Sequence, residues 1–343
     1  MSLSNVSNGN RLRWDGKKSP FYEVYYLKIT DAEKGWSFWA RYTLLSPKKE
    51  MGKADAAIWG IFSRLSGQAR LGNPATVALK QIHPLFRIDP FHSERFIQIQ
   101  ENFLSLDAAV GELADSDHEI RWDLRFEDPT LSTALYPYPF LYRFPFPKTK
   151  FLEPRLSTHV SGRLTVDRET ISLNHHRAHQ AHLWGSAYAR RWVWGNCNQF
   201  SEDPSAVFEG VVAQIKLGPI PSPPLALFYF IVEGREYRAN SIVQWIKNDS
   251  THDLLTWQFS AECGEVKFAG TVSRDIAAIA GVEYQGPNGE RRYCHSSMFA
   301  DMRLEMYRRQ NKEWILAKHL TARKTAAFET VEPRPDPRVK FVL

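Results

Sequence analysis

The sequence predicts an all-β fold made of two consecutive antiparallel β-barrel domains. Three observations lead to this prediction. Hydrophobic and polar residues alternate with period 2 in many short stretches, which is typical of strands with one buried face. Turns rich in glycine, proline and charged residues separate these stretches, as in antiparallel barrels and sandwiches. A proline-rich segment near the middle interrupts the pattern, which then starts again.

The first half of the chain contains six predicted strands and no sustained helical period. The clearest strand covers residues 119–127, where Ile120, Trp122, Leu124 and Phe126 alternate with charged side chains. The other five cover residues 21–30, 36–45, 54–62, 76–82 and 94–100.

The predicted domain boundary lies in residues 137–155, PYPFLYRFPFPKTKFLEPR, which contain five prolines. Proline has no backbone N–H to donate to a strand ladder, so we expect strand pairing to break here. We therefore divide the chain into an N-terminal barrel of residues 1–150 and a C-terminal barrel of residues 151–343.

The second half resumes the period-2 pattern. Residues 174–187 are rich in histidine and follow no period, so we expect an irregular segment there, and a short helix near 273–281. Two runs of about eight strands each would suit two barrels. The predicted strands of this half are 160–167, 188–200, 206–215, 225–234, 255–262, 265–272, 301–307 and 313–320.

Composition and charge argue against several classes of protein. The chain has 343 residues and a net charge of +6, spread thinly and without any nucleic-acid-binding motif, so we expect no nucleic acid partner. Mild basic clusters at 303–309 and 318–324 are compatible with peripheral contact with an anionic membrane surface. No phosphate loop, dinucleotide fingerprint or nucleophile elbow occurs. Three widely spaced cysteines, Cys197, Cys263 and Cys294, indicate reduced thiols and a cytoplasmic protein.

The most informative stretch is residues 182–200, HLWGSAYARRWVWGNCNQF. We expect a strand from Tyr188 onward, with large aromatic rings, two amides and a guanidinium on one face. Such a mixture suits a concave ligand site, but it also fits tryptophans packed in a core with polar residues at the wet ends. The residues on that face are Tyr188, Arg190, Trp192, Trp194, Asn196, Asn198 and Phe200.

Two stretches carry a family resemblance. Residues 21–29, FYEVYYLKI, resemble the first-strand signature of tocopherol cyclases, with Glu23, Tyr26 and Lys28 in matching positions. Residues 182–200 resemble the central signature of the same family, which is similar to the carotenoid hydratases (hydroxyneurosporene synthases). The resemblance implies lipocalin-like, calycin-type barrels and a hydrophobic, isoprenoid-like ligand. The matching central residues are Trp184-Gly185, Tyr188, Trp192, Trp194, Cys197-Asn198 and Phe200.

Two glutamates are candidate catalytic acids. Glu209 shares one face of its predicted strand with Val207, Val211, Ala213 and Ile215. A carboxyl on an apolar face is desolvated, which raises its pKa and keeps it protonated, and a protonated carboxyl is what acid-promoted addition to an alkene needs. Glu23 is surrounded in the same way by Phe21, Tyr25, Leu27 and Ile29. Alternatively, each glutamate pairs with a buried tyrosine or arginine, with Arg41 and Arg190 as the candidate arginines.

Four histidines, His175, His176, His179 and His182, form a cluster in the sequence that could hold a metal ion. On a helix, His175, His179 and His182 would share a face, as a three-histidine zinc site requires. The preceding residues favour a strand and no carboxylate is near in sequence, so a polar loop at a barrel mouth fits better and we predict no metal. His182 is retained as a third candidate catalytic residue at the mouth of the ligand cavity.

These observations lead to one functional prediction with an alternative. The chain is expected to bind a hydrophobic small molecule in or beside the second barrel and to act as a cofactor-independent cyclase or hydratase, an isomerase or lyase. The alternative is a non-catalytic carrier of a lipophilic ligand, because fold alone does not separate the two. The predicted ligand-binding residues are Trp184, Tyr188, Trp192, Trp194, Asn196 and Asn198.

Overall fold

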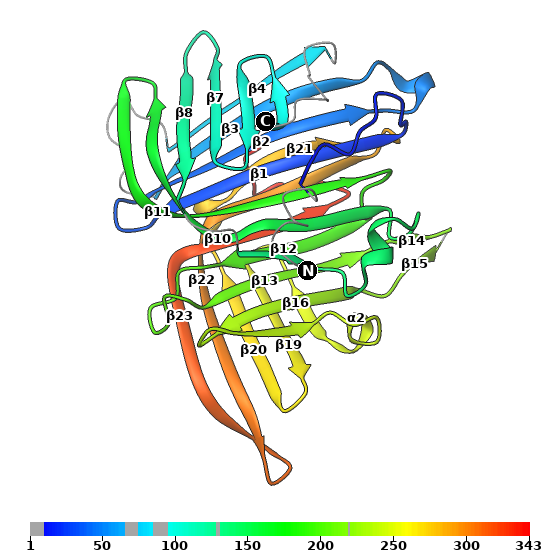
Figure 1. Cartoon of the computed structure of the whole chain (residues 1–343), viewed down its shortest axis with the longest axis vertical. Helices are drawn as coiled ribbons and strands as arrows, with labels where there is room; N and C mark the ends of the chain where they lie inside the picture. Colours follow the sequence, from blue (N-terminus) through cyan, green and yellow to red (C-terminus); the bar gives the residue numbers. More distant parts are fainter. Residues whose placement is uncertain (1–9, 66–74, 85–94, 128–130, 219) are drawn as a thin grey trace.

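The structure is a computed structural model that describes residues 10–65, 75–84, 95–127, 131–218 and 220–343. Two large antiparallel sheets contain most of the described residues, so the all-β prediction is confirmed (Figure 1). Each sheet curls on itself: β3 and β4 contact β7 across the first sheet, and β17 contacts β19 across the second. The two curled sheets match the barrel-like architecture predicted from the alternating strands.

The first sheet has eleven strands in the order β4-β3-β2-β1-β11-β10-β8-β7-β6-β5, with β9 paired to β10. Their bounds are β1 (Phe21–Asp31), β2 (Trp36–Ser46), β3 (Asp55–Arg64), β4 (Thr76–Pro84), β5 (Arg95–Ile99), β6 (Asn102–Ser105), β7 (Ala108–Ala114), β8 (Glu119–Phe126), β9 (Leu131–Ala134), β10 (Thr149–Val166) and β11 (Glu169–Gly185).

The second sheet has ten strands in the order β17-β16-β13-β12-β23-β22-β20-β19-β18, with β21 paired to β22. Their bounds are β12 (Arg191–Cys197), β13 (Val207–Gln214), β16 (Leu225–Val232), β17 (Arg235–Ala239), β18 (Asp249–His252), β19 (Thr256–Cys263), β20 (Val266–Ser273), β21 (Ala280–Gln285), β22 (Arg291–Gln310) and β23 (Glu313–Glu332).

Helices are short and peripheral in the described part of the chain. They are α2 (Gln244–Lys247) and the 3₁₀ turns η1 (Lys49–Met51), η3 (Pro139–Tyr142) and η4 (Ile276–Ala278), and a small ladder joins β14 (Lys216–Leu217) to β15 (Ile220–Pro221). The turn η4 falls inside the segment where a helix was expected from the sequence, but it spans a single turn. None of the helices described is long and apolar enough to cross a membrane.

Three large hydrophobic cores and two small clusters form among the described residues. One lies inside the first sheet, one inside the second, and the third lies between the two sheets. Strand β1 is buried along nearly its whole length because its two faces enter different cores. Tyr25 and Leu27 pack inside the first sheet, whereas Tyr22, Val24 and Tyr26 pack against the second sheet.

The change from one sheet to the other comes later than the predicted boundary at residues 150 and 151. Strands β10 and β11 both belong to the first sheet, and the chain enters the second sheet between Gly185 and Arg191. Pro154 lies inside β10 and does not end that strand. The ladder between β10 and β11 shifts register between Leu152 and Arg155, and proline is compatible with such irregularities.

The histidine-rich segment is also more regular than predicted. Residues 174–185 belong to the long strand β11, which pairs with β1 on one side and β10 on the other. No simple alternation is visible in its sequence because both faces of its second half are buried. Strands β22 and β23 are also buried on both faces over part of their length. For that reason they are longer than the stretches 301–307 and 313–320 predicted from the sequence.

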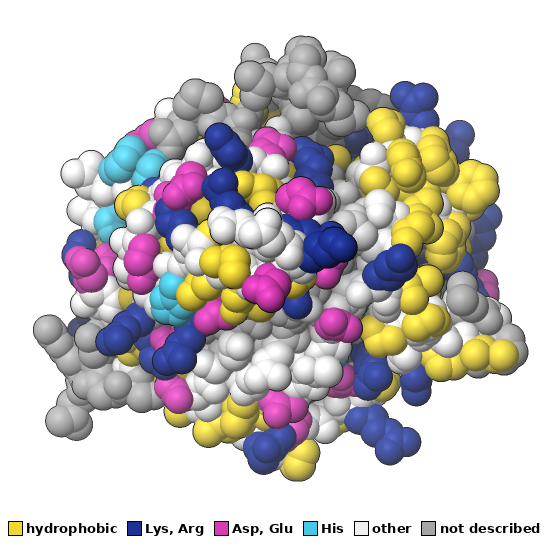
Figure 2. All heavy atoms as spheres, turned by 90° about the horizontal axis from the view of Figure 1, so that it is seen from below, with side chains coloured by type: hydrophobic (Ala, Val, Ile, Leu, Met, Phe, Trp, Pro, Cys, Tyr) yellow, Lys and Arg dark blue, Asp and Glu magenta, His cyan; other side chains and the backbone are white. Residues whose placement is uncertain are grey.

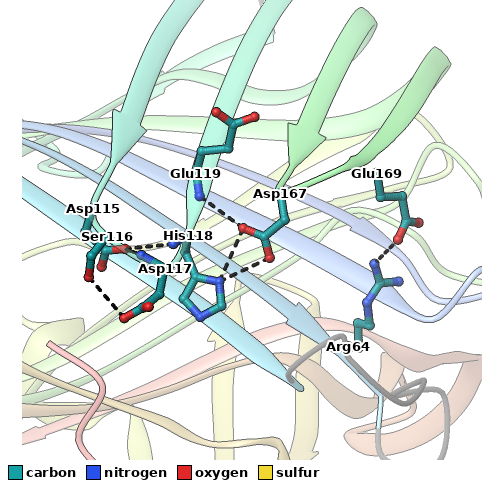
Figure 3. Close-up of polar contacts among 8 residues, drawn as sticks. All are labelled: Arg64, Asp115, Ser116, Asp117, His118, Glu119, Asp167 and Glu169. Carbon is teal, nitrogen blue, oxygen red and sulfur yellow. Dashed lines mark hydrogen bonds and ion pairs between the residues drawn. The ribbon is translucent and has the colours of Figure 1, made fainter.

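Polar side chains tie together the hairpins at one end of the first sheet (Figure 3). In the turn before β8, His118 Nδ1 lies 3.1 Å from a carboxylate oxygen of Asp167, which belongs to the turn between β10 and β11. The backbone N–H of Glu119 donates to the same carboxylate at 3.0 Å. Nearby, Arg64 donates to Glu169 at 2.6 Å. These contacts fix strand ends, at a partly exposed position where ion pairs contribute little to stability.

Candidate active site

A cavity of about 420 Å³ lies between the two sheets. Its walls include residues of β1, β2, β10, β11, β12, β13, β16, β21, β22 and β23, together with the segments preceding β10 and β12. The lining is largely apolar and aromatic, and a few polar groups project into it, as in ligand pockets generally. The polar side chains include Tyr26, Arg41, Tyr284, Arg292 and Glu329.

Aromatic rings form a continuous wall on one side of this cavity. Trp192 stacks on Tyr284 with ring centroids 6.4 Å apart, and Tyr188 lies 5.8 Å from Trp192. Trp194 meets Tyr26 edge to face at 5.5 Å. Rings presented in this way could stabilise a positive charge on a bound molecule through their negative faces.

One carboxyl, Glu329, reaches the cavity wall directly. It lies opposite Trp194 in the β12–β23 ladder, so both side chains share the interface face. Trp192 Nε1 donates to Glu329 at 3.2 Å, and the Tyr284 hydroxyl donates at 3.4 Å. Burial raises the pKa of Glu329, while nearby Arg41 opposes that rise. The hydrogen bonds from Trp192 and Tyr284 also lower the pKa of Glu329, but burial is the largest influence and the pKa stays above its ordinary value.

Sequence reasoning missed Glu329. The signal was the one that selected Glu209, namely a carboxyl alternating with apolar residues: Ala327, Glu329 and Val331 share a strand face. It was overlooked because the predicted strand ended at residue 320, whereas β23 continues to Glu332.

Glu209 lies just behind the aromatic wall, fully buried. Trp194 Nε1 donates to it at 2.5 Å and Asn196 Nδ2 at 2.9 Å. His179 Nε2 lies 3.6 Å from Glu209 and 2.6 Å from a second buried carboxyl, Glu153 of β10. The indole of Trp194 therefore separates Glu209 from the cavity, and Glu209 itself does not line it.

The group of Glu153, His179 and Glu209 carries an unusual proton balance. Burial raises the pKa of both carboxyls, and the negative charge of Glu209 raises the pKa of Glu153 further. Burial lowers the pKa of His179, and the neighbouring Lys28 ammonium acts in the same direction. Two carboxylates this close cannot both ionise easily, so the group retains a proton on a carboxyl at neutral pH.

These three residues could also offer one ligand atom each to a metal ion, all within 4.8 Å of one another. The surrounding donors fit a proton better than a cation. Both oxygens of Glu209 already accept hydrogen bonds from Trp194 and Asn196. Lys28, whose pKa burial lowers to about 8, donates to the Asn196 carbonyl beside the group.

Glu23 and His182 form a separate buried pair inside the first sheet, 2.8 Å apart. Glu23 also accepts hydrogen bonds from the backbone N–H groups of Arg13 and Trp14 and from the Tyr25 hydroxyl. Neither residue lines the cavity, so the predicted places of Glu23 at its polar end and His182 at its mouth need correction. The reason is that odd positions of β1 face the first core, away from the second sheet.

Of the predicted ligand-binding residues, three line the cavity and three lie outside it. Tyr188, Trp192 and Trp194 line the cavity, as their shared strand face indicated. Asn196 instead binds Glu209, and Asn198 donates to the Ala178 carbonyl at 2.9 Å, joining the sheets. Trp184 packs beside His182 and under the Arg13 guanidinium, inside the first sheet.

The two arginines considered as partners of the glutamates, and the histidines His175 and His176, do not join Glu23 or Glu209. Arg41 lines the cavity and Arg190 donates to Gln214 at 3.0 Å, so neither arginine pairs with Glu23 or Glu209. His175 and His176 approach Glu127 and Asp31. The four histidines therefore do not converge, because alternate residues of a strand point to opposite faces.

Comparison with known proteins identifies the family of this chain. The family model described as tocopherol cyclase-like matches residues 157–331. The chain belongs to the tocopherol cyclase-like family. The matched region of this tocopherol cyclase-like chain includes Glu209, Tyr284, Glu329 and the tryptophans of β12, whereas the N-terminal stretch that resembles the family, residues 21–29, lies outside it.

Solved structures support the fold assignment of this family member. Kievitone hydratase from Nectria haematococca superposes with a TM-score of 0.56 at 10% identity, covering 92% of this chain and 89% of that one. CghA, crystallised with Sch210972, gives a TM-score of 0.55 at 11% identity, covering 94% and 92%. An uncharacterized protein of Mycobacterium tuberculosis is 22% identical over 58% of this chain, a match that spans 59% of that protein.

Proposed function

We propose that this tocopherol cyclase-like protein binds a hydrophobic, isoprenoid-like molecule between its two sheets and catalyses acid-promoted cyclisation or hydration of an alkene. The observation that carries the proposal is a carboxyl of raised pKa, Glu329, on the wall of a cavity lined by aromatic rings. The family membership and the name of the structural neighbour kievitone hydratase support the same reaction class.

The proposed reaction needs only a placed acid and an aromatic wall. Protonated Glu329 gives its proton to one alkene carbon, which leaves a carbocation on the other. The rings of Trp192, Trp194 and Tyr284 stabilise that cation. A hydroxyl of the same molecule then adds to close a ring, or water adds to give an alcohol, and the proton released by the adding oxygen returns to Glu329. The predicted acid Glu209 is placed to take part only if Trp194 moves aside, because the indole lies between it and the cavity.

The reaction can be tested in D₂O with a prenylated hydroquinone and a linear isoprenoid alkene as probes. Acid-promoted addition leaves one deuterium bound to carbon in the product, which mass spectrometry detects whether the product is cyclic or hydrated. We expect Glu329→Gln to lower kcat by at least about 10²-fold while ligand affinity stays within a few-fold. Glu332→Gln serves as a control, because Glu332 ends the same strand and does not line the cavity. Full activity in Glu329→Gln would contradict this assignment of the acid.

The alternative function is a non-catalytic carrier of a lipophilic ligand. It is favoured if the purified protein retains a hydrophobic ligand in native mass spectrometry yet never incorporates deuterium into any probe. In that case Glu329→Gln should leave ligand retention unchanged, because the apolar walls supply the binding energy.

We further propose that the protein contacts an anionic membrane surface peripherally, from the cytoplasmic side, to collect its ligand. Hydrophobic side chains gather on one side of the molecule with basic residues among them (Figure 2). The same side carries α2 and β15 in Figure 1, where Ile220 and Ile246 are exposed. Phe140 and Phe144 are exposed just before Pro147 and Lys148, which line the cavity. Phe144 and Ile246 are also close in the chain to Phe146 and Trp245, which line the cavity, so exposed apolar side chains lie near it.

Sedimentation with vesicles tests this contact. Wild-type protein should bind vesicles containing phosphatidylglycerol more strongly than vesicles of phosphatidylcholine alone. The double substitution Phe140→Ser and Phe144→Ser should abolish that binding. Ile82→Ser is the matched control, because Ile82 is equally exposed on β4 of the first sheet. Equal loss in both variants would argue against a specific patch.

A further inference from the structure

The cavity contains a buried cation, Arg41 of β2, which feels the charge of Glu329 but makes no ion-pair contact with any described carboxylate. The residue is 6% exposed and lines the cavity. Its Nε and Nη1 atoms are buried and donate no hydrogen bond to any described residue. Among those residues, no carboxylate forms an ion pair with it either. A buried guanidinium without an anion is costly, and proteins normally pair such a charge.

Three aromatic rings hold the guanidinium in place. Its central carbon lies 4.3 Å from the ring centre of Tyr284, 5.0 Å from that of Trp59 and 5.2 Å from that of Trp39. Cation–π contacts compensate part of the desolvation cost and fix the orientation of the group, but they supply no hydrogen-bond acceptor. The protein thus positions Arg41 firmly and leaves hydrogen-bond donors without acceptors.

The balance of charge around the cavity points the same way. Besides Arg41, the lining includes Lys148, Lys216 and Arg292, whereas its acidic residues are Glu290 and Glu329. Glu290 accepts hydrogen bonds from the backbone N–H groups of Tyr188 and Asn288, so it is engaged elsewhere. Burial favours the neutral form of Glu329. The cavity is therefore net positive and suited to an anion.

We propose that Arg41 binds an ionised oxygen group of the ligand, a carboxylate or an enolate joined to a hydrocarbon body. This inference rests on the proposed function, because it concerns the same cavity. Tyr284 connects the two ends of the site: its ring lies under Arg41 and its hydroxyl donates to Glu329 at 3.4 Å. The ligand's anionic group would therefore lie close to the alkene that Glu329 protonates.

Paired probes with the same hydrocarbon chain test the proposal. Binding of decanoate and of decan-1-ol to the full-length protein is measured by titration calorimetry near neutral pH, where decanoate is ionised. We expect wild-type protein to bind decanoate about ten- to a hundred-fold more tightly than the alcohol, the range that a charge-assisted hydrogen bond gives. Arg41→Met should erase this preference by weakening decanoate binding while leaving the alcohol within about three-fold.

Lys80→Met is the matched control. Lys80 lies over the same ring of Trp59, 4.0 Å from its centre, but is exposed and does not line the cavity. It should keep the preference for decanoate. Equal binding of both probes to wild-type protein would overturn the role of Arg41 and leave the cavity function standing, and this result does not depend on whether Arg41→Met folds. A loss of preference in Lys80→Met equal to that in Arg41→Met would also overturn it. Failure of both probes to bind would overturn the cavity function together with this inference.

Discussion

Two buried histidines of β11, His179 and His182, each contact a glutamate, yet the two pairs are built differently. Because the residues are three positions apart on a strand, their side chains enter opposite faces of the first sheet. Glu23 beside His182 accepts hydrogen bonds from two backbone N–H groups and a tyrosine. Glu153 beside His179 instead faces another carboxyl, Glu209.

The difference shows how donors decide what a buried carboxyl can do. A carboxyl that accepts hydrogen bonds from several backbone and side-chain donors holds those donors in place and serves to fix structure. Here Glu23 fastens Arg13 and Trp14, and the Tyr25 hydroxyl fastens the Asn10 carbonyl, beside the first core. Glu153 and Glu209 lie so close together that both cannot ionise easily, so they share a proton and form a proton store. Sequence patterns alone make these glutamates look alike.

The largest effect should come from removing the saturated carboxylate. Glu23→Ala leaves the backbone donors of Arg13 and Trp14 and the buried His182 without an acceptor, so we expect a loss of about 3–5 kcal/mol in the free energy of unfolding. Glu153→Gln should change it by less than about 1.5 kcal/mol, since a neutral amide replaces a carboxyl whose neutral form is favoured by burial and by Glu209. Urea unfolding measures both. Comparable losses in the two variants would remove the distinction between the pairs.

A second comparison separates the two signature tryptophans. Trp194 lines the cavity, whereas Trp184 lies in the first core beside His182. We expect Trp194→Ala to weaken binding of decan-1-ol by about 1–3 kcal/mol, in line with loss of a buried aromatic contact. Trp184→Ala should destabilise the fold but leave the affinity of the folded protein unchanged. Calorimetry at a temperature where both variants are folded decides between these outcomes.

The fold could be predicted further than the site. Alternation identified β8, β19 and β20 to within a residue or two, because each alternates between buried and more exposed positions. β1 and β2 were predicted equally well from the charged turn that separates them. Alternation also put Trp192 and Trp194 on one wall correctly. It could not show that this wall faces the other sheet instead of a barrel interior, because both environments are apolar.

The unpredicted parts of the site depend on contacts between distant segments. Glu153 and Arg41 carry no local signal, since each acquires its role only when the two sheets pack together. Glu23 looked like a catalytic acid because its donors, the backbone N–H groups of residues 13 and 14, are invisible in a side-chain pattern. Strand register and packing between distant segments thus determine the roles of these residues, and hydrophobic periodicity in the sequence does not reveal them.

The proton store also predicts a pH dependence of stability. Glu153 and Glu209 have pKa values raised above the ordinary 4.5, so their favourable contribution is full below that value and is lost as pH rises through the raised values. The pKa of His179 is lowered, so this histidine makes the protein more stable as pH rises, but only at pH values below its ordinary pKa of 6.5. Burial lowers the pKa of Lys28 to about 8, so this lysine also makes the protein more stable as pH rises, but only above about pH 8.

Between pH 6.5 and about 8, therefore, Glu153 and Glu209 dominate the difference in the pH dependence of stability between wild-type protein and Glu153→Gln. We expect wild-type stability to fall with rising pH by up to about 1.4 kcal/mol per pH unit more than that of the variant. Urea unfolding across this range measures the slopes. Parallel slopes would mean that the pair does not hold a proton.

The smallest effect concerns the single donor that links the proton store to the cavity wall. Trp194→Phe keeps the ring and removes the N–H that donates to Glu209 at 2.5 Å. This donor lowers the pKa of Glu209 because it stabilises the charged form, so its loss should cost about 1 kcal/mol more above the raised pKa than below it. Trp245→Phe is the control, since its N–H donates to the Asn240 carbonyl, which does not titrate, and its cost should not vary with pH. If both variants lose the same stability at every pH, Glu209 does not ionise in the folded protein, and the carboxyl pair keeps its proton throughout.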